Sequence, residues 1–327
     1  MRMTKKHFSI IAFALTVLLF VPFLLYMPIE VAGHRPGNLP MLMLYSGFLA
    51  FTVAALVVFA LILITKTEYV KMQVATFSRF RYLLYMMVKR DFVTRYRRSV
   101  LGVIWSVLNP LLTMLVLTFV FSQIFRFQVE NFPVYVLSGQ LIFNFFSEAT
   151  NQAMGSILNN GAVIKKVYVP KYVFPVTRVM SSVVNMSFTF IAFLIVFIVT
   201  GESFNWSILL VFLPIIYTFI FALGVGMLLS SLVVFFRDIN YIYGVGITLW
   251  MFLTPIMYPV YILPDRVYHL IHLNPMFHYV NYFRDLALHG TIPGLWANII
   301  CIGFALAALC AGTFAIMSQQ DKYILYL

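Results

Sequence analysis

The sequence predicts an all-α, polytopic membrane protein with about eight transmembrane helices. The chain is 62% hydrophobic and only 10% charged, and its mean hydropathy is +0.96. A soluble domain carries about 25% charged residues, so this chain has too little polar surface to be coated by water. Aromatic residues make up 17% of the chain and gather at the ends of apolar runs, as interfacial belts do.

Apolar segments of about 20 residues, enough to cross a ~30 Å hydrocarbon core, recur along the chain. The first follows three basic residues at the N-terminus, so a cleavable signal peptide is an alternative. That run is long for a signal peptide and no small-x-small cleavage site follows it, so we expect a retained helix. The eight expected spans are 8–28, 41–64, 101–125, 132–157, 173–200, 207–235, 240–261 and 295–317.

The basic residues predict the orientation of these spans. If the N-terminus is cytoplasmic, eighteen of the 22 lysines and arginines fall on the cytoplasmic side, which the positive-inside rule favours. Both termini are then expected in the cytoplasm. The net charge of +12 lies in short connections rather than on a soluble domain, so no nucleic-acid partner is expected.

The longest cytoplasmic segment, 66–98, contains an amphipathic helix. Its apolar residues Phe80, Leu83, Leu84, Met87 and Val88 follow helical spacing, and most basic residues lie off that stripe. Such a helix suits the inner headgroup layer of a membrane. The alternative is a helix that packs on the bundle.

Two further connections carry structural signals. In residues 159–172 we expect a short cytoplasmic helix and then a turn, because Pro170 and Pro175 interrupt a continuing helix. Residues 262–294 are too polar to span and contain three prolines and four histidines. They predict two short helices that dip into the outer leaflet as a re-entrant hairpin.

The sequence lacks the usual motifs of catalysis and nucleotide binding. It contains no Gly-Lys dipeptide and therefore no P-loop, and no Rossmann, HExxH or nucleophile-elbow pattern. The spacing of His269, His272, His278 and His289 fits no common metal site. We expect no cofactor and no metal in this chain, so any ATP must be used by another chain.

Polar and charged groups inside the expected spans are rare, so each of them is informative. Asn144, Glu148, Asn151, Gln152 and Gly155 share one face of a helix, and a carboxylate within a span is a functional candidate. The alternative is a structural hydrogen-bonding face between helices. Similarly, the Arg237-Asp238 pair at a cytoplasmic turn either forms an ion pair that ends a helix or contacts a cytoplasmic partner.

Several stretches together resemble one family, the membrane subunit of polysaccharide and teichoic-acid ABC exporters, in the type-2 ABC permease class. The resemblance covers about residues 80–320. The residues that carry it are Arg90-Asp91-Phe92, Arg95-Tyr96-Arg97-Arg98-Ser99, Leu101-Gly102, Trp105, Asn109-Pro110, Asn160, Lys165-Lys166, Pro170, Pro175, Phe236-Arg237-Asp238-Ile239, Thr254-Pro255-Ile256, Asn274-Pro275 and Arg284-Asp285.

The resemblance implies a homodimer of six-helix permeases with two copies of an ABC ATPase subunit, which holds ATP and Mg²⁺. It implies export of a lipid-linked glycan or polyol-phosphate polymer across the bacterial plasma membrane. The domains would be an extra two-helix segment (1–70), an amphipathic interface helix (71–100) and a six-helix permease (101–327). The first segment departs from the family, and the sequence gives it no role.

The resemblance also implies site residues. ATPase coupling would fall to Asn160, Lys165, Lys166, Pro170, Lys171, Arg237 and Asp238. The interface or gate helix would use Arg90, Asp91, Arg95, Tyr96, Arg97 and Arg98, and the outer gate Asn274, Pro275, Arg284 and Asp285. Aromatic and amide side chains suit a sliding glycan, so the candidates for a translocation pathway are Asn144, Glu148, Asn151, Gln152 and Tyr258.

Three alternative functions are open. One is a permease for small-molecule or lipid efflux. Another is a membrane enzyme acting on lipid-linked sugars, for which Asp265, Asp285 and the outer histidines are the only candidates. The third is an ion-driven carrier, but this would need several charged residues within spans.

Overall fold

The computed structural model describes residues 67–97, 102–125, 127, 129–167, 169–319 and 322–326. Every regular element in these ranges is a helix, which confirms the predicted all-α class. The two expected N-terminal spans, 8–28 and 41–64, lie outside the described residues, as does Arg98.

The described helices follow one another with short connections. They are α3 (Thr67–Tyr96), α4 (Ile104–Thr118), its π-helical continuation η2 (Phe119–Ile124), α5 (Phe132–Met154), α6 (Ser156–Asn159), α7 (Gly161–Lys166), α8 (Val173–Val199), η3 (Trp206–Val211), α9 (Phe212–Phe235), α10 (Ile239–Leu253), η4 (Val260–Ile262), α11 (Asp265–Ile271), α12 (Pro275–Ala287), α13 (Leu295–Gln319) and α14 (Tyr323–Tyr326).

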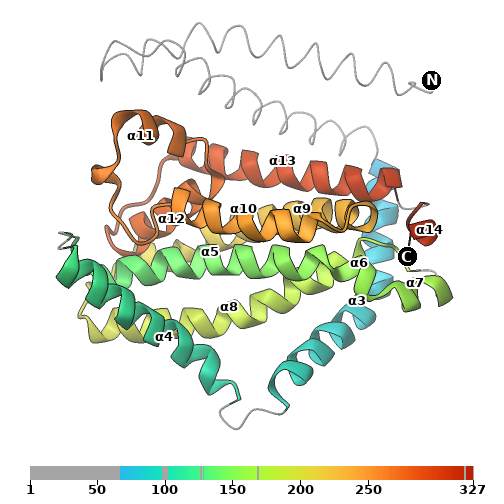
Figure 1. The fold of residues 1–327 in the computed structure, drawn as a ribbon, viewed down its shortest axis with the longest axis horizontal. Coiled ribbons are helices and arrows are strands. Elements are labelled where there is room, and N and C mark those ends of the chain that lie inside the picture. The colour runs from blue at the N-terminus through green and yellow to red at the C-terminus, as the bar shows by residue number, and fades with distance from the viewer. Residues whose placement is uncertain are drawn as a thin grey trace, which may run out of the picture.

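The long helices run between two ends of a bundle. Figure 1 shows α6, α7 and α14 at one end, which we call the α7 end, and α11 and α12 at the other, which we call the α12 end. The turn from α9 to α10 also lies at the α7 end. The alternation of the connections between the two ends matches the alternation that the sequence predicts for residues 101–319.

Helix α5 forms the centre of the bundle. Most of its side chains are buried, and it packs against α8, α9 and α12. Helices α9 and α13 pack closely against each other, because Gly224 faces the backbone of Ala308 and Leu309. A small residue at this position of α9 therefore allows close helix packing.

Four described helical segments are long and apolar enough to cross a membrane: 104–122, 173–199, 206–235 and 295–319. Two expected spans differ from these. Helix α5 is more polar, and α10 has 15 residues, which is about 22 Å and short of the ~30 Å core. The expected helix 240–261 was too long: α10 ends at Leu253, two residues before Pro255, which lacks an N–H donor. The number of eight spans stays a prediction.

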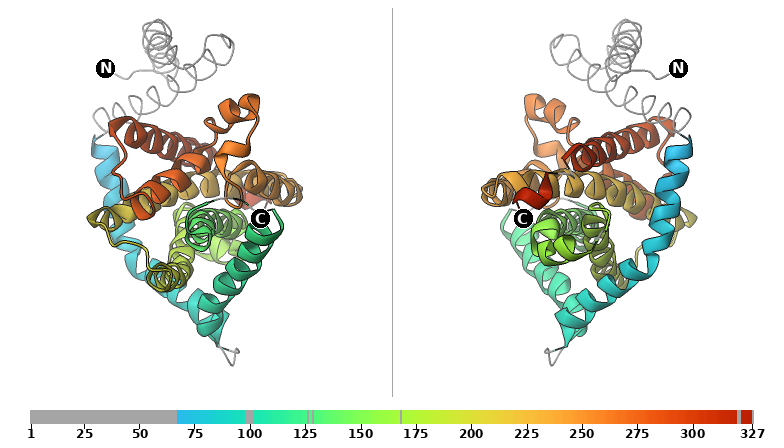
Figure 2. Two further views of the ribbon diagram at one scale, coloured as in Figure 1. Left: turned by 90° about the vertical axis from the view of Figure 1, so that its left-hand side faces the viewer. Right: turned by 90° about the vertical axis from the view of Figure 1, so that its right-hand side faces the viewer.

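The expected short elements are present. Helix α7 ends at Lys166 and a turn lies at residues 171–172, and α11 and α12 are the two short helices expected in 262–294. The apolar stripe of α3 packs on the bundle, because Leu84 and Met87 are buried in a cluster with Ile164, Val173 and Phe174. This is the second of the two arrangements considered for that stripe. Figure 2 shows α3 and α4 along two sides of the bundle, with the end of α3 and the start of α4 close together.

Candidate functional site

A polar junction joins α3, α5 and α8 near the α7 end. The Oε1 atom of Glu148 accepts hydrogen bonds from Arg95 Nη1 at 2.7 Å, Gln152 Nε2 at 2.7 Å and Asn185 Nδ2 at 2.6 Å. Three helices thus meet on one carboxylate. The Glu148 face of α5 acts here as a hydrogen-bonding face between helices, which was the alternative to a purely functional carboxylate.

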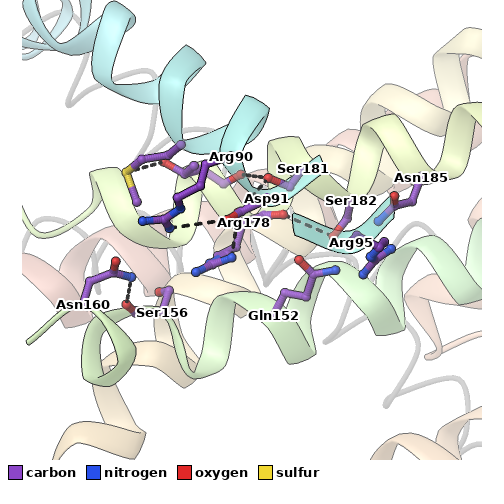
Figure 3. A network of polar contacts seen from close by, with 12 residues as sticks. Arg90, Asp91, Arg95, Gln152, Ser156, Asn160, Arg178, Ser181, Ser182 and Asn185 are labelled. Carbon is purple, nitrogen blue, oxygen red and sulfur yellow. Dashed lines mark hydrogen bonds and ion pairs between the residues drawn. The ribbon is translucent and has the colours of Figure 1, made fainter. Parts of the chain in front are cut away.

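Asp91 forms a second ion pair in the same junction (Figure 3). Its carboxylate accepts from Arg178 Nη1 at 2.6 Å and Ser181 Oγ at 3.2 Å, and Arg90 Nη2 lies 3.4 Å away. Arg178 was not among the candidate residues. It is nevertheless the single charged residue of α8, and this signal could have identified it.

Tyr96 ties α3 to two other helices. Its hydroxyl hydrogen-bonds with Ser106 Oγ at 2.7 Å and donates to Asn185 Oδ1 at 3.3 Å. Its ring also packs against Phe92 and Phe188. The structure therefore brings together Asp91, Arg95 and Tyr96 of the expected interface helix, whereas Arg97 is exposed.

A cavity of about 440 Å³ opens beside this junction. Three arginines, one carboxylate and several amide or hydroxyl groups line it, and its size lies within the usual range of ligand pockets. The lining residues are Val88, Arg90, Asp91, Phe92, Thr94, Arg95, Gln152, Arg178, Ser181, Val184 and Asn185.

The structure does not gather the five pathway candidates in one place. Glu148 and Gln152 are bonded to each other, but Asn144 and Asn151 are exposed, and Asn151 Nδ2 donates to the carbonyl of Ser147 at 2.9 Å. Tyr258 lies beyond the end of α10, where its hydroxyl donates to the carbonyl of Phe252 at 2.7 Å.

At the α12 end, Arg284 lies buried at a break between helices. Residues 254–259 connect α10 to η4 without helical hydrogen bonding, so the carbonyls of Pro255 and Ile256 need donors. Arg284 supplies them: Nη1 donates to Pro255 O at 2.7 Å and Nη2 to Ile256 O at 3.0 Å. Nη2 also donates to Tyr135 O at 3.1 Å and Nε to Ser138 Oγ at 3.3 Å.

Two neighbours complete this arginine site. The guanidinium carbon lies 3.5 Å from the centre of the Tyr135 ring, a cation–π contact. Gly139 leaves space for the guanidinium group, because a Cβ at this position would come within 2.9 Å of Arg284 Nη2. Sequence reasoning missed Tyr135, Ser138 and Gly139, which lie about 150 residues from Arg284.

The other residues expected at the outer gate make separate contacts. Asn274 caps α12: its Oδ1 accepts from Met276 N at 3.0 Å and from Trp250 Nε1 at 2.7 Å. Pro275 follows at the first helical position, where a missing N–H costs nothing. Asp285 forms an exposed pair with His289 at 3.2 Å.

The expected coupling residues fall into two groups at the α7 end. Lys165, Lys166, Arg237 and Asp238 are exposed. Asn160 and Lys171 are buried, where Asn160 Nδ2 donates to Ser156 O at 2.7 Å and Lys171 Nζ lies 3.5 Å from Val169 O. In the part of the chain that the structure describes, no ion pair joins Arg237 to Asp238, so that alternative is not seen.

The described residues contain no group of three His, Cys, Asp or Glu that could hold a metal ion. His278 instead lies buried with Nε2 2.7 Å from His272 O, and burial lowers the pKa of its imidazole. Cys301 and Cys310 are both free.

Comparison with known proteins shows the family to which the chain belongs. The profile of the ABC-2 type transporter family matches residues 82–288, which is well over half of the chain. The chain belongs to this family. Its matched region runs from α3 through α12 and so contains both the junction and the Arg284 site.

Curated relatives include export permeases. The chain is 32% identical over 223 residues to the O-antigen export system permease protein RfbA of Klebsiella pneumoniae, covering 67% of this chain and 85% of that protein. It is 24% identical over 248 residues to the polysialic acid transport protein KpsM of Escherichia coli, covering 72% and 92%. It is 23% identical over 207 residues to the capsule polysaccharide export inner-membrane protein CtrC of Neisseria meningitidis, covering 61% and 76%.

These matches confirm the resemblance to type-2 ABC permeases of polysaccharide export. As a member of this family, the chain is a transporter subunit rather than an enzyme. Four of the described helical segments are long and apolar enough to cross a membrane, as such a role requires.

Proposed function

We propose that this chain is the membrane subunit of an ATP-driven exporter that moves a polysaccharide across the bacterial inner membrane. The relatives, which are an O-antigen export permease, a polysialic acid transport protein and a capsule polysaccharide export protein, support this substrate class. ATP would be bound by a separate ABC ATPase subunit, since the chain has no P-loop motif.

The observation that carries the proposal is the open face of α10. This face combines aromatic, hydroxyl and glycine residues at helical spacing, and Tyr241 is 80% exposed. An added Cβ at Gly244 or Gly246 would meet nothing within 4 Å, so the backbone there is uncovered. The residues of this face are Tyr241, Gly244, Val245, Thr248, Leu249 and Phe252.

Such a face suits the wall of a path for a sliding glycan. A tyrosine ring can stack on a sugar without fixed hydrogen bonds, and a threonine hydroxyl offers exchangeable ones. A second copy of the chain would close this path, so we include a homodimer in the proposal. Apolar surface on α4 and η2, such as Leu112 and Leu115 of α4 and Phe119 of η2, is available for the same contact or for lipid.

The α7 end would dock the ATPase. Lys165 and Lys166 on α7 and the α9–α10 turn with Arg237 and Asp238 are exposed and lie at the same end of the bundle. Two copies of the ATPase would then dock on a homodimer. Movement of the ATPase would be transmitted through α7 to α8, whose first residues pack in the same buried cluster as Ile164.

Within this proposal the polymer is lipid-linked, either a polysaccharide or a teichoic-acid-type chain. A permease for small-molecule or lipid efflux is the second candidate, supported by the family alone. An enzyme acting on lipid-linked sugars is weaker, because Asp285 pairs with His289 on an exposed surface rather than in a pocket.

Copurification with the ATPase tests the docking. The ATPase subunit should copurify with the chain, and Lys165→Glu with Lys166→Glu should abolish both copurification and permease-stimulated ATP hydrolysis. Lys89→Glu is the matched control, because it reverses an exposed lysine on a different helix, α3. The docking proposal fails if the double variant retains full binding and stimulation, or if Lys89→Glu loses as much.

A further inference from the structure

We propose that the cavity between α3 and α8 binds the head group of an anionic phospholipid, a phosphodiester that carries one negative charge. This inference goes beyond the export function and does not depend on it. It concerns a lipid that stays with the protein, not the exported polymer.

The charges of the junction call for one further anion. Arg90, Arg95, Arg178 and Asp91 line the cavity, and Glu148, which pairs with Arg95 from outside the lining, is the second carboxylate of the junction. Three guanidinium groups and two carboxylates leave one positive charge in excess. A phosphodiester neutralises this excess, whereas a pyrophosphate would reverse it.

The donors suit phosphate. Each guanidinium has five N–H donors, and Arg178 and Arg95 each use only Nη1 in their ion pairs. Asp91 holds Arg178 in place at 2.6 Å, so that its fork is already oriented for a bidentate contact. Arg90 is about half exposed and contacts Asp91 at 3.4 Å, so it can turn toward a ligand.

Beside the cavity, α8 provides a surface for an acyl chain. Val184 lines the cavity, and Ile191, Ile195 and Ile198 continue the same helical face toward the α12 end. All three isoleucines are exposed, and Ile198 is 75% exposed. The distance from Val184 to Ile195 is about 16 Å along the helix, which is roughly the thickness of one leaflet.

The position along the helices also fits a headgroup. Arg178 lies five residues after the start of α8 and Gln152 lies two residues before the end of α5, so the cavity is close to the α7 end of the bundle. The cationic end of the cavity therefore lies at the level where a span leaves the membrane, and the apolar stripe lies deeper. Together they match the shape of one phospholipid.

Native mass spectrometry of the full chain, with any subunit that copurifies, measures the bound lipid. The protein is taken from nanodiscs that contain equal amounts of phosphatidylglycerol and phosphatidylethanolamine. The wild-type chain should retain phosphatidylglycerol. Arg90→Gln should weaken its retention by about tenfold, since one charge-assisted contact is lost.

Two further variants keep the test decisive. Lys89→Gln removes the neighbouring exposed lysine, which does not line the cavity, and should leave retention unchanged. Thr94→Glu adds a carboxylate at an exposed position of the cavity and should reduce retention at least as much as Arg90→Gln, at an unchanged melting temperature.

Three results overturn the assignment. One is equal retention of the two lipids by the wild-type chain, and another is equal loss in Lys89→Gln and Arg90→Gln. The third is displacement of phosphatidylglycerol by a polyprenyl pyrophosphate at equal concentration, which would assign the cavity to a pyrophosphate lipid instead.

Discussion

The two ends of the bundle hold charged side chains by opposite means. At the α3–α5–α8 junction, arginines pair with carboxylates, and Arg95 and Glu148 keep 44% and 32% of their side chains exposed. At the α12 end, Arg284 is 3% exposed and its hydrogen bonds go to three carbonyls and one hydroxyl. The described residues give Arg284 no carboxylate partner within ion-pair distance.

This difference distinguishes a region whose contacts can open, the α3–α5–α8 junction, from a region whose contacts stay fixed, the Arg284 site. A half-exposed ion pair exchanges easily with water or lipid, so its net contribution to stability is small. A buried arginine that satisfies several carbonyls cannot leave without exposing all of them. We therefore expect the Arg95–Glu148 pair to adapt during transport and the Arg284 site to keep the break after α10 rigid.

The largest effect is expected from Arg284→Met. The substitution keeps much of the volume but leaves the carbonyls of Pro255 and Ile256 without donors, which should cost about 3–5 kcal/mol of folding stability. Thermal unfolding in detergent measures it. Arg284→Lys should recover part of the loss, because an ammonium keeps the charge but cannot reproduce the fork. An unchanged melting temperature in Arg284→Met would show that the site is not a clamp.

A smaller loss of folding stability is expected from Gly139→Ala. Its methyl group would press on Arg284 Nη2 and Ile256, so we expect a loss of about 1–3 kcal/mol. Gly244→Ala on α10 is the matched control, because its Cβ would meet nothing and alanine favours a helix. Equal melting temperatures of the two variants would contradict a close approach of Arg284 to α5.

The coupling free energy between Arg95 and Glu148 in the junction should be only about 0.5–1 kcal/mol. A double-mutant cycle with Arg95→Ala and Glu148→Ala measures it, and the coupling should shrink as salt is added. A salt-independent coupling of several kcal/mol would mean that this pair is as fixed as the Arg284 site. The two ends of the bundle would then not differ in how firmly they hold their charged side chains.

The smallest stability effect is expected at the α9–α10 turn. Arg237→Ala and Asp238→Ala remove exposed side chains and should change stability by less than about 0.5 kcal/mol. If the turn contacts the ATPase, permease-stimulated ATP hydrolysis should nevertheless fall. Variants that melt normally and stimulate hydrolysis fully would remove the turn from the docking surface.

The sequence predicted what depends on local pattern. The spacing of Leu84 and Met87 predicted the amphipathic face of α3, and Pro170 with Pro175 predicted the turn after α7. Pro255 carried enough information to end α10 at Leu253, and the expected span 240–261 ran past it. The polar face around Glu148 was also visible, because its residues lie on one helix.

What the sequence could not predict is which distant residues meet. Arg95 and Asn185 are 53 and 37 residues from Glu148, and Tyr135 is 149 residues from Arg284. Their contacts depend on how helices pack, so Arg284 was expected at a gate rather than beneath a helix break. The burial of Lys171 and Asn160 was equally invisible in a loop rich in basic and polar residues.

The export function is tested most directly by ATP-dependent polymer transport in inverted vesicles. The chain and its ATPase subunit would be reconstituted together, and entry of a labelled lipid-linked polysaccharide into the vesicle lumen would be followed. We expect entry only when both subunits and hydrolysable ATP are present. Equal entry with the chain alone, or none with both subunits and ATP, would contradict the assignment as an ATP-driven polysaccharide export permease.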